Sequence, residues 1–166
     1  MKLRSVNAGW VGLLLLAAIP GMVRAAEVSE AELTVITSEK LTFDYQNQYA
    51  LFEKDVVVVD PSMKLFSDNL LVTFDENNKA KKIKAEGRVR IVQEDKQARS
   101  KVAEYNVETG EIVLTGEPQV TRGKDTLTAE VIRFWRDENR MECSPRARLV
   151  IYPSEDGSPR ESLFGE

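Results

Sequence analysis

Apolar residues occupy every second position over long stretches of this chain. Residues 84–91 and 111–114 are typical, and Val, Ile, Thr, Tyr and Phe dominate such stretches while Asn, Asp and Gly separate them. An alternation of two places successive side chains on opposite faces of a β-strand, whereas a helix needs a period of about 3.6. The pattern therefore predicts an all-β chain of about eight long strands, joined by polar turns, with no helix.

The runs repeat at a nearly constant spacing. Similar eight-residue segments begin at Ser38, Ser67, Ser100 and Ala129, which are 29, 33 and 29 residues apart. The four additional residues of the second interval fall in the polar turn at 77–80, where a structural repeat tolerates an insertion. The spacing predicts four hairpin repeats of about 29 residues, each made of a strand, a tight polar turn and a return strand.

A second marker follows each of these segments. Lys54, Gly87, Gly116 and Pro145 lie 16, 20, 16 and 16 residues after the four starts, in the middle of the return strands. Glycine or proline inside a strand favours a bend or a bulge. We therefore expect three of the four return strands to bend, at Gly87, Gly116 and Pro145, so that the sheet folds over into a sandwich or a roll.

The alternation also predicts which side chains share one face of the sheet. Nearly all of them are apolar, and their sequence neighbours are polar. In the first strands of the hairpins the face consists of Leu41, Phe43, Tyr45, Leu70, Val72, Phe74, Ala103, Tyr105, Val107, Ile132 and Phe134. In the return strands it consists of Ala50, Phe52, Val56, Val58, Ile83, Ala85, Val89, Ile91, Ile112, Leu114, Pro118, Val120, Met141, Cys143, Ala147 and Leu149. Taken alone, the pattern is most simply interpreted as the packed interior of a β-sandwich.

The N-terminal residues have the pattern of a targeting segment. Lys2 and Arg4 precede an uncharged apolar stretch at residues 8–19, and residues 23–25 (Val-Arg-Ala) place small residues at the −3 and −1 positions of a cleavage site. The stretch is shorter than the roughly 20 residues that cross a bilayer. We therefore predict a cleaved signal peptide at 1–25, with an uncleaved anchor as the alternative.

The remainder of the chain is expected to form one domain at 26–152 and a flexible tail at 153–166, which is rich in proline and glycine. Loss of the signal segment removes three basic residues and no acidic one, which leaves 20 basic and 27 acidic residues and a net charge of −7. A chain this acidic is a poor candidate for sequence-independent binding of nucleic acid, because such binding requires neutralisation of phosphates. We therefore expect no nucleic-acid partner.

Residue types that carry catalytic or metal chemistry are scarce. The chain has no histidine, which removes Ser-His and Cys-His nucleophile pairs and the commonest transition-metal ligand. It contains neither a glycine-rich phosphate loop nor a calcium-type spacing of carboxylates. Its one cysteine, Cys143, cannot form an intrachain disulfide and is interpreted as a small buried hydrophobe. We predict no catalytic residue, no metal site, no cofactor and no enzymatic activity.

Several segments resemble the OstA-like domain of the LptA family, which comprises periplasmic proteins of lipopolysaccharide transport. The likeness extends over residues 33–151, and its most specific parts are the Ala-x-Gly-x-Val-x-Ile stretch at 85–91 and the Val-Leu-Thr-Gly stretch at 113–116. Lys54 and Pro145 stand where the family usually has glycine. Further similar segments are residues 38–45, 52–59, 67–70, 105–107 and 116–120.

The resemblance implies a bent antiparallel β-jellyroll, shaped like a V, whose apolar interior is a groove for the acyl chains of lipid A. It implies a periplasmic protein that carries lipopolysaccharide from the inner to the outer membrane, with lipopolysaccharide-transport proteins of both membranes as partners. The residues expected to line the groove are Leu41, Phe43, Tyr45, Phe52, Val56, Val72, Phe74, Ile83, Val89, Ile91, Tyr105, Val107, Ile112, Leu114, Phe134 and Leu149.

The family also implies that copies join end to end by strand pairing, as a head-to-tail homo-oligomer. The residues expected at the pairing edges are Leu33, Val35, Ile36, Leu149, Val150 and Ile151. Both edge segments are β-branched and apolar and contain no proline within the run. Natural edge strands that stay single usually carry proline or charged residues that block pairing, so their lack here suggests that these edges pair. Strand addition to an exposed edge is a common recognition mode.

Two alternatives stay open at this point. A membrane-anchored, LptC-like subunit of the same pathway would keep residues 1–25, which N-terminal sequencing of the mature protein would reveal. A structural β-repeat protein with a fully packed core would bind no lipid. Lys79, Lys81, Lys82 and Lys84 crowd one turn; they could meet phosphates at a groove rim, although a solvated hairpin tip is the simpler interpretation.

Overall fold

The structure, a computed structural model, describes residues 33–153. The expected signal segment and nearly all of the expected tail lie outside the described residues. Within them the chain forms twelve strands in one antiparallel sheet and no helix, as the alternation predicts. The strands are β1 Val35–Thr37, β2 Lys40–Asp44, β3 Tyr49–Asp60, β4 Met63–Phe74, β5 Ala80–Gln93, β6 Lys96–Asn106, β7 Glu111–Thr115, β8 Gln119–Arg122, β9 Asp125–Thr128, β10 Val131–Trp135, β11 Arg140–Ser144 and β12 Arg148–Val150.

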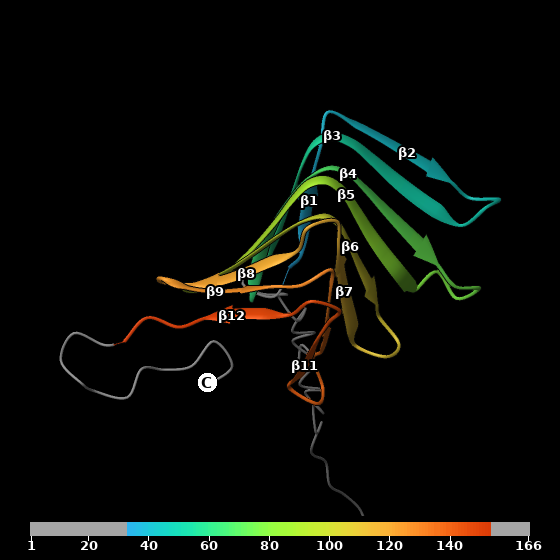
Figure 1. The fold of residues 1–166 in the computed structure, drawn as a ribbon. Coiled ribbons are helices and arrows are strands. Elements are labelled where there is room, and N and C mark those ends of the chain that lie inside the picture. Colours follow the sequence, from blue (N-terminus) through green and yellow to red (C-terminus); the bar gives the residue numbers. More distant parts are fainter. Residues whose placement is uncertain (1–32, 154–166) are drawn as a thin grey trace, which may run out of the picture.

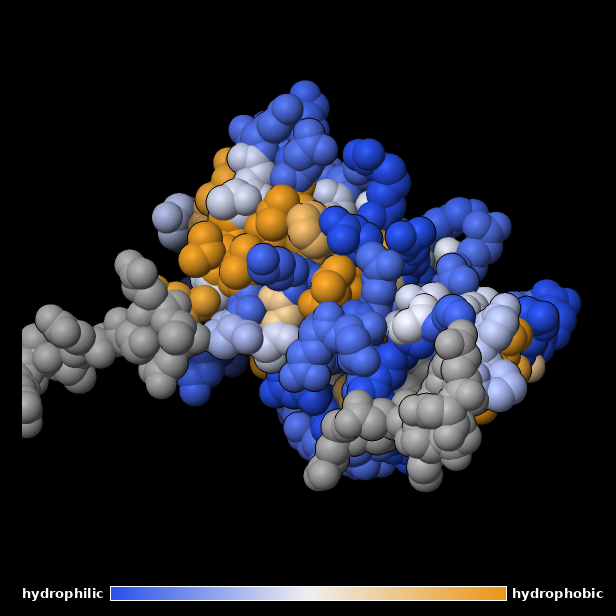
Figure 2. Space-filling model, turned by 90° about the vertical axis from the view of Figure 1, so that its left-hand side faces the viewer, coloured by the Kyte–Doolittle hydropathy of each residue, from blue (hydrophilic) through white to orange (hydrophobic). Residues whose placement is uncertain are grey.

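Four long strands, β3 to β6, run through both halves of a sharply bent sheet (Figure 1). One half, the β2 wing, has the strand order β2-β3-β4-β5-β6-β7-β10-β11. The other half, the β1 wing, has the order β1-β3-β4-β5-β6-β8-β9-β12. The two wings enclose an inner face, and Figure 2 shows the molecule from the side of the β1 wing, with polar residues at the top where the strands bend.

The bend follows the four positions that the sequence marks. Lys54, Gly87 and Gly116 have φ values of 65°, 76° and 75°, and Arg146, after Pro145, has a φ of 55°. In β3 and β5 the pairing register shifts at these points, between Glu53 and Val56 and between Glu86 and Val89. A left-handed residue interrupts the ladder and turns the strand, so the bends predicted at Gly87, Gly116 and Pro145 are confirmed, and Lys54 makes a fourth. We call this line of bends the crest.

Glycine is required at the crest where the neighbouring strand comes close. A Cβ atom at Gly116 would lie 2.5 Å from the Cβ of Lys101, and one at Gly87 would overlap the side chain of Asp68. Lys54, in the first hairpin, adopts the same left-handed conformation with a side chain, at a cost of about 1–2 kcal/mol. Its departure from the family's glycine therefore leaves the geometry of the bend intact.

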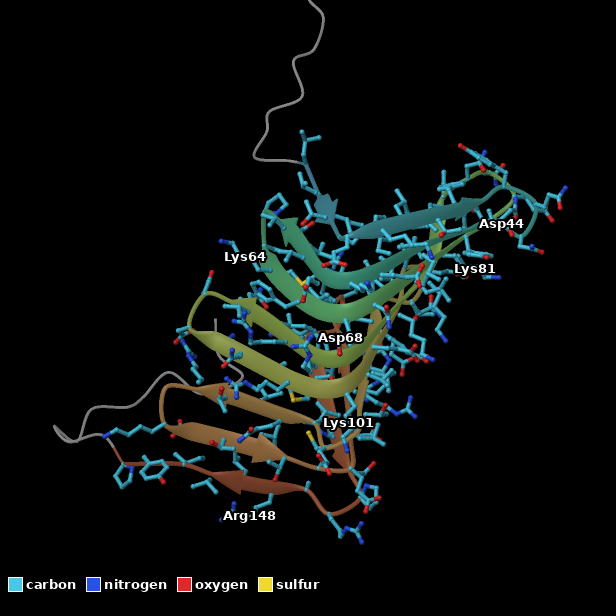
Figure 3. The ribbon with its side chains drawn as sticks, turned by 90° about the horizontal axis from the view of Figure 1, so that it is seen from above. Asp44, Lys64, Asp68, Lys81, Lys101 and Arg148 are labelled. Atoms are coloured by element: carbon cyan, nitrogen blue, oxygen red, sulfur yellow. The ribbon has the colours of Figure 1, made fainter. Side chains whose placement is uncertain are left out.

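Ion pairs cross the crest between neighbouring strands. Lys54 Nζ lies 3.3 Å from Glu39 Oε2, and Lys101 Nζ lies 3.3 Å from Glu117 Oε2. Arg88 pairs with Asp68, and Arg146 pairs with Glu130. Figure 3 looks down on the crest, with Asp68 and Lys101 on its outer side. These pairs are largely exposed, so each contributes little to stability.

The strand count and the strand starts differ from the prediction of eight long strands. Four strands are long and eight are short. The chain bends through the crest in the middle of the sheet but leaves the ladder there on both sides of the centre, between β1 and β2, β7 and β8, β9 and β10, and β11 and β12. The predicted starts at Ser67 and Ser100 lie inside β4 and β6, at the crest. First strands therefore bend as well as return strands, since each must follow its hydrogen-bonded neighbour.

The core lies on the inner face, along and beside the crest. Leu70, Ile132, Val56 and Val89 are at most 2% exposed. Each such side chain contributes about 1.5–3 kcal/mol on leaving water. Because the chain has one cysteine and no intrachain disulfide, these buried aliphatic side chains hold the two wings in their bent arrangement.

Candidate functional site

The inner face is built from three rows of directly paired residues. Each row takes one residue from each of eight adjacent strands, and every member is apolar. The tip row, nearest the free end of the β2 wing, consists of Phe43, Ala50, Val72, Ile83, Tyr105, Ile112, Phe134 and Met141. The middle row, between it and the crest, consists of Leu41, Phe52, Leu70, Ala85, Ala103, Leu114, Ile132 and Cys143. The β1-wing row consists of Ile36, Val58, Leu65, Ile91, Ala98, Val120, Leu127 and Leu149.

Most of the residues expected to line a groove fall into these rows. Paired residues of antiparallel strands point to the same face, so the register brings eleven of the sixteen together, and these are Leu41, Phe43, Phe52, Val72, Ile83, Ile91, Tyr105, Ile112, Leu114, Phe134 and Leu149.

The other five expected residues lie at the margins of the rows. Val56 and Val89 pair with Ser67 and Ser100 at the crest, and Phe74 pairs with Ala80 across a bulge. Tyr45 and Val107 follow β2 and β6 at the free end of the β2 wing.

Burial changes along each row, from the centre of the sheet to its edges. Leu70 and Ile132 in the middle row are each 1% exposed, whereas Leu41 at the end of that row is 56% exposed. Phe43 ends the tip row with 43% exposure, and Leu149 ends the β1-wing row with 45%. The inner face is thus closed at its centre and open to solvent at the edges of the sheet.

Aromatic side chains gather at the β2 edge of the inner face. The ring centroid of Phe43 lies 4.5 Å from that of Tyr45 and 5.5 Å from that of Phe74. Tyr45 is 83% exposed. Such rings present a large apolar area that solvent still reaches.

Two charged groups mark the far ends of the wings. The guanidinium of Arg136, which follows β10, lies 5.8 Å from the ring centroid of Tyr105. Asp60, at the end of β3 in the opposite wing, accepts hydrogen bonds from the hydroxyls of Thr34 and Ser62, and these lower its pKa. The charge of Arg136 lowers the pKa of Asp60 further.

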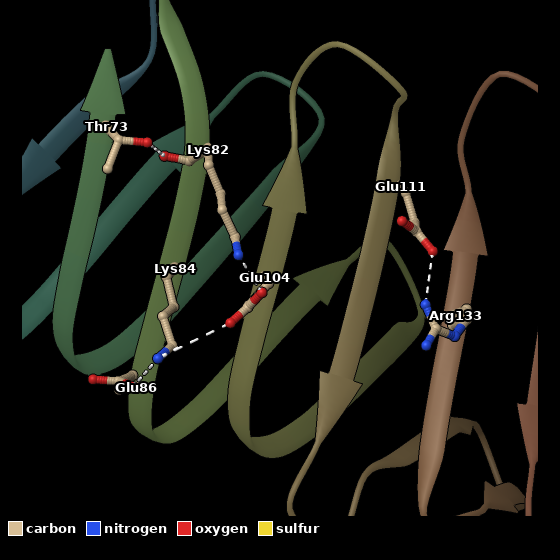
Figure 4. Close-up of polar contacts among 7 residues, drawn as sticks. All are labelled: Thr73, Lys82, Lys84, Glu86, Glu104, Glu111 and Arg133. Atoms are coloured by element: carbon tan, nitrogen blue, oxygen red, sulfur yellow. Dashed lines mark hydrogen bonds and ion pairs between the residues drawn. The ribbon is translucent and has the colours of Figure 1, made fainter.

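The outer face of the β2 wing carries paired charges instead of apolar rows (Figure 4). Lys82 Nζ lies 2.6 Å from Glu104 Oε2, and Lys84 Nζ lies 2.6 Å from Glu86 Oε1. The hydrogen bond to Glu86 raises the pKa of Lys84. The suggestion that the lysine-rich turn meets phosphates at a groove rim is therefore wrong for Lys82 and Lys84, which turn away from the inner face.

The expected pairing residues lie at the two edges of the β1 wing. Val35 and Ile36 belong to β1, which pairs only with β3 among the described strands. Leu149 and Val150 belong to β12, which in the same part of the chain pairs only with β9. Leu33 and Ile151 flank these strands and are 46% and 65% exposed.

Sequence reasoning missed part of the inner face. Leu65, Ala98 and Leu127 lie in the β1-wing row, but the predicted apolar face did not include them. The alternation around Leu127, with threonine on both sides, carried a signal for strand β9. Cys143 lies in the middle row and is half-buried, and burial raises the pKa of its thiol.

Comparison with known proteins supports the same interpretation of the fold. The crystal structure of LptH, described as the LptA homologous periplasmic component of the conserved lipopolysaccharide transport device from Pseudomonas aeruginosa, matches with a TM-score of 0.66 at 20% sequence identity. The match covers 74% of this chain and 96% of that chain, which establishes an LptA-like β-jellyroll fold. No curated protein sequence matches the chain.

Residues 33–153 contain no group of His, Cys, Asp and Glu side chains that could hold a metal ion. The same residues contain no helix long and apolar enough to span a membrane.

The sequence model of the family described as "LptA/(LptD N-terminal domain) LPS transport protein" matches residues 35–140, which is more than half of the chain. The protein therefore belongs to this family of lipopolysaccharide-transport proteins.

Proposed function

We propose that this protein is a periplasmic carrier that shields the acyl chains of lipopolysaccharide on its inner face, between the inner and the outer membrane. The observation that carries the proposal is the exposure of the rows at both edges of the sheet. A fully packed sandwich would bury Phe43 and Leu149, yet both remain more than two-fifths exposed beside a continuous apolar face. The expected signal peptide at 1–25 fits this location.

The energetics of such a face suit a lipid with several chains. Each methylene gains about 0.8 kcal/mol on leaving water, so an acyl chain of about ten methylenes gains about 8 kcal/mol. Charged head groups would remain near the free ends of the wings, where Arg136 lies over Tyr105. The face carries no group that could supply energy for transport, so the carrier accepts and passes lipid down a gradient that other proteins create.

Photo-crosslinking from neighbouring residues on opposite faces tests the carrier proposal. A photoreactive residue at Phe43, Tyr105 or Leu149 should capture lipopolysaccharide in cells. The same residue at Thr42, Glu104 or Val150, on the outer face, should capture little. Glu117 and Arg146 at the crest serve as further outer controls. Equal capture from both faces contradicts the proposal and favours a structural repeat protein with no lipid ligand.

The strand number of the wings supports end-to-end assembly. Each wing contains eight antiparallel strands, an even number, so its two edge strands run in opposite directions. When a second copy is placed in line with the first, β12 of one lies antiparallel to β1 of the next. Pairing of Leu149 with Ile36 would continue the β1-wing row across the junction. We propose that copies join in this heterologous way, which does not close.

The free donors of β12 can be identified from one hydrogen bond. The N–H of Tyr152 donates to Asp125 Oδ1 on β9, at 2.9 Å. Because N–H groups alternate along a strand, that of Val150 also faces β9, whereas those of Leu149 and Ile151 face the free edge. Ile151 is therefore the position at which a substitution reaches the edge without breaking the pairing of β12 with β9.

Ile151→Pro should remove one free donor and weaken association about tenfold, which corresponds to about 1.4 kcal/mol. Ile151→Thr keeps the donor and serves as the control. Sedimentation at increasing protein concentration should show the parent protein and the Thr variant forming longer species. The Pro variant should form them only at about tenfold higher concentration. If the parent protein stays monomeric at all concentrations, assembly of the isolated protein is ruled out.

A further inference from the structure

A second apolar surface lies on the outer face of the β1 wing. It consists of Val35, Val57, Val59, Phe66 and Val92, which we call the outer valine patch, and Lys64 of β4 stands between Val59 and Val92 in the register. The register places Val35 opposite Val59 and Val57 opposite Phe66, while the alternate residue Val58 points inward. Val35 and Val59 are 51% and 41% exposed. Figure 2, which faces this wing, shows hydrophobic residues gathered below the charged crest.

The corresponding surface of the β2 wing has a different chemistry. There Leu51 pairs with Leu71 on the outside of β3 and β4, but charged outward residues of β5, β6, β7 and β10 form ion pairs, such as that of Arg133 with Glu111 at 3.0 Å. Alternation alone would make both outer faces polar. The valines of the β1 wing are not needed for the inner core, so their clustering on the outside indicates a surface that something covers.

The cations beside the patch point to an acidic occupant. Arg90 on β5 lies directly opposite Arg99 on β6, and like charges in that position destabilise a sheet. The guanidinium of Arg90 lies 3.9 Å from the ring centroid of Phe66, and Arg99 donates a hydrogen bond to Gln97. Neither arginine forms an ion pair with any residue of the described range 33–153. A carboxylate placed between them would relieve this repulsion.

The chain itself contains a segment with the matching chemistry. Residues 154–166 hold four acidic residues and one arginine, and Leu163 and Phe164 stand next to each other near the end of the segment. The segment follows β12, which is five strand spacings from β4, or about 24 Å. The ten residue-to-residue steps from Pro153 to Leu163 span up to about 33 Å when extended. The segment is long enough to cross the outer face to the patch.

The order of the groups also matches. A chain that crosses the outer face from β12 passes β9 and β8, then reaches Arg99 on β6 and Arg90 on β5, and finally Phe66 and Val59. Along the segment, Glu155, Asp156 and Glu161 come before Leu163 and Phe164. Carboxylates therefore arrive at the arginines, and the apolar pair arrives at the valines.

We propose that residues 154–166 dock on the outer valine patch of the same chain, with Leu163 and Phe164 on the patch and acidic side chains beside Arg90 and Arg99. This docking holds the segment on the outer face and away from the free edge of β12. Pro153 and Pro159 act in the same direction, since proline disfavours a strand that would cover that edge. The segment then guards the patch against aggregation while the pairing edge stays available. The inference stands without the carrier proposal, since none of its residues lies on the inner face.

The test places a photoreactive phenylalanine analogue at Phe164 in the purified full chain and maps its crosslinks by mass spectrometry. Crosslinks to Val57, Val59 or Phe66 on the outer face are expected. In the double variant Arg90→Gln/Arg99→Gln their yield should fall about fivefold, within the range that loss of two exposed charge contacts implies. Arg133→Gln removes a charge from the outer face of the β2 wing and should leave the yield unchanged. Salt at about 1 M, where the Debye length is about 3 Å, should lower the yield of the parent protein.

An equimolar mixture of isotopically light and heavy protein separates contacts within one chain from contacts between copies. Crosslinks within one chain support the proposal, and crosslinks between light and heavy chains overturn it. Crosslinks spread over both wings, or insensitive to the arginine variants, also overturn it. Thermal unfolding of each variant establishes that the fold is retained. As a second measurement, a synthetic peptide of residues 154–166 should bind a chain that ends at Pro153 and should bind its Arg90→Gln/Arg99→Gln variant more weakly; no binding to either overturns the proposal.

Discussion

The two wings share four strands and one alternation of side chains, yet they present different surfaces. The β2 wing has aromatic side chains on its inner face, such as Phe43 and Tyr105, and ion pairs outside. The β1 wing has only aliphatic side chains in its inner row, and an apolar patch outside. Both wings are antiparallel sheet, so their different side chains point to different contacts for each wing. We propose that the β2 wing provides the main lipid area and that the β1 wing contacts protein segments.

A second contrast runs along the rows, between their centre and their ends. Central residues such as Leu70 and Ile132 are buried and hold the bend, while end residues such as Leu41 and Phe43 are exposed. A row thus divides into a part that stabilises the fold and a part that stays free for a ligand. The predictions below test these two contrasts.

The largest effect is expected from truncation at the centre of the middle row. Leu70→Ala should lower the free energy of unfolding by about 2–5 kcal/mol, because it leaves a cavity between buried neighbours. Leu41→Ala, in the same row but 56% exposed, should cost less than about 1 kcal/mol. Urea unfolding of both variants measures the difference. Similar losses would contradict the division of the row.

Lipid binding should respond in the opposite way. Phe43→Ala should weaken the binding of lipopolysaccharide about tenfold, since an exposed ring of the aromatic cluster is lost, and should hardly change stability. Leu149→Ala, at the end of the β1-wing row, should weaken binding less. Titration with fluorescent lipopolysaccharide measures both. A larger effect at Leu149 would move the main lipid area to the β1 wing.

A stabilising change is expected at the crest. Lys54 adopts a φ of 65°, where a side chain is strained, and its ion pair with Glu39 is exposed. Lys54→Gly should therefore raise the free energy of unfolding by up to about 1 kcal/mol. Lys54→Ala loses the ion pair but keeps the strain, and should be neutral or slightly destabilising. Differential scanning calorimetry distinguishes the two.

The smallest effect concerns pH and the end of the β1 wing. Hydrogen bonds from the hydroxyl of Thr34 and from the hydroxyl and backbone N–H of Ser62, together with the charge of Arg136, lower the pKa of Asp60 in the folded chain. A carboxyl whose pKa is lowered by folding contributes stability above its unfolded pKa, and this contribution is lost as pH falls through the folded pKa. Below about pH 4 the parent protein should therefore lose stability more steeply than Asp60→Asn. Parallel slopes in chemical unfolding between pH 5 and pH 2 would show that these contacts contribute nothing.

Much of the fold and part of the candidate site could be predicted from the sequence. Alternation identified the face that carries Phe43, Tyr105 and Leu114, because the side-chain period of a strand is a local property. Gly87, Gly116 and Pro145 identified three of the four bends, because the conformational preferences of glycine and proline also act locally, whereas the bend at Lys54 appeared only in the structure. That these side chains contact lipid remains a proposal.

The tertiary structure decided what depends on neighbouring strands. The sequence shows Ser67 and Ser100 as starts of a repeat, but the register places them at the crest, inside strands that continue into the β1 wing. It also decides that Lys82 and Lys84 meet Glu104 and Glu86 on the outer face, that Leu41 at a sheet edge stays exposed while Leu70 is buried, and that Arg90 faces Arg99. The sequence by itself determined the faces and three of the four bends, since each follows from the conformation of single residues. Pairing, burial and edges follow from which strands become neighbours, and that is a property of the folded sheet.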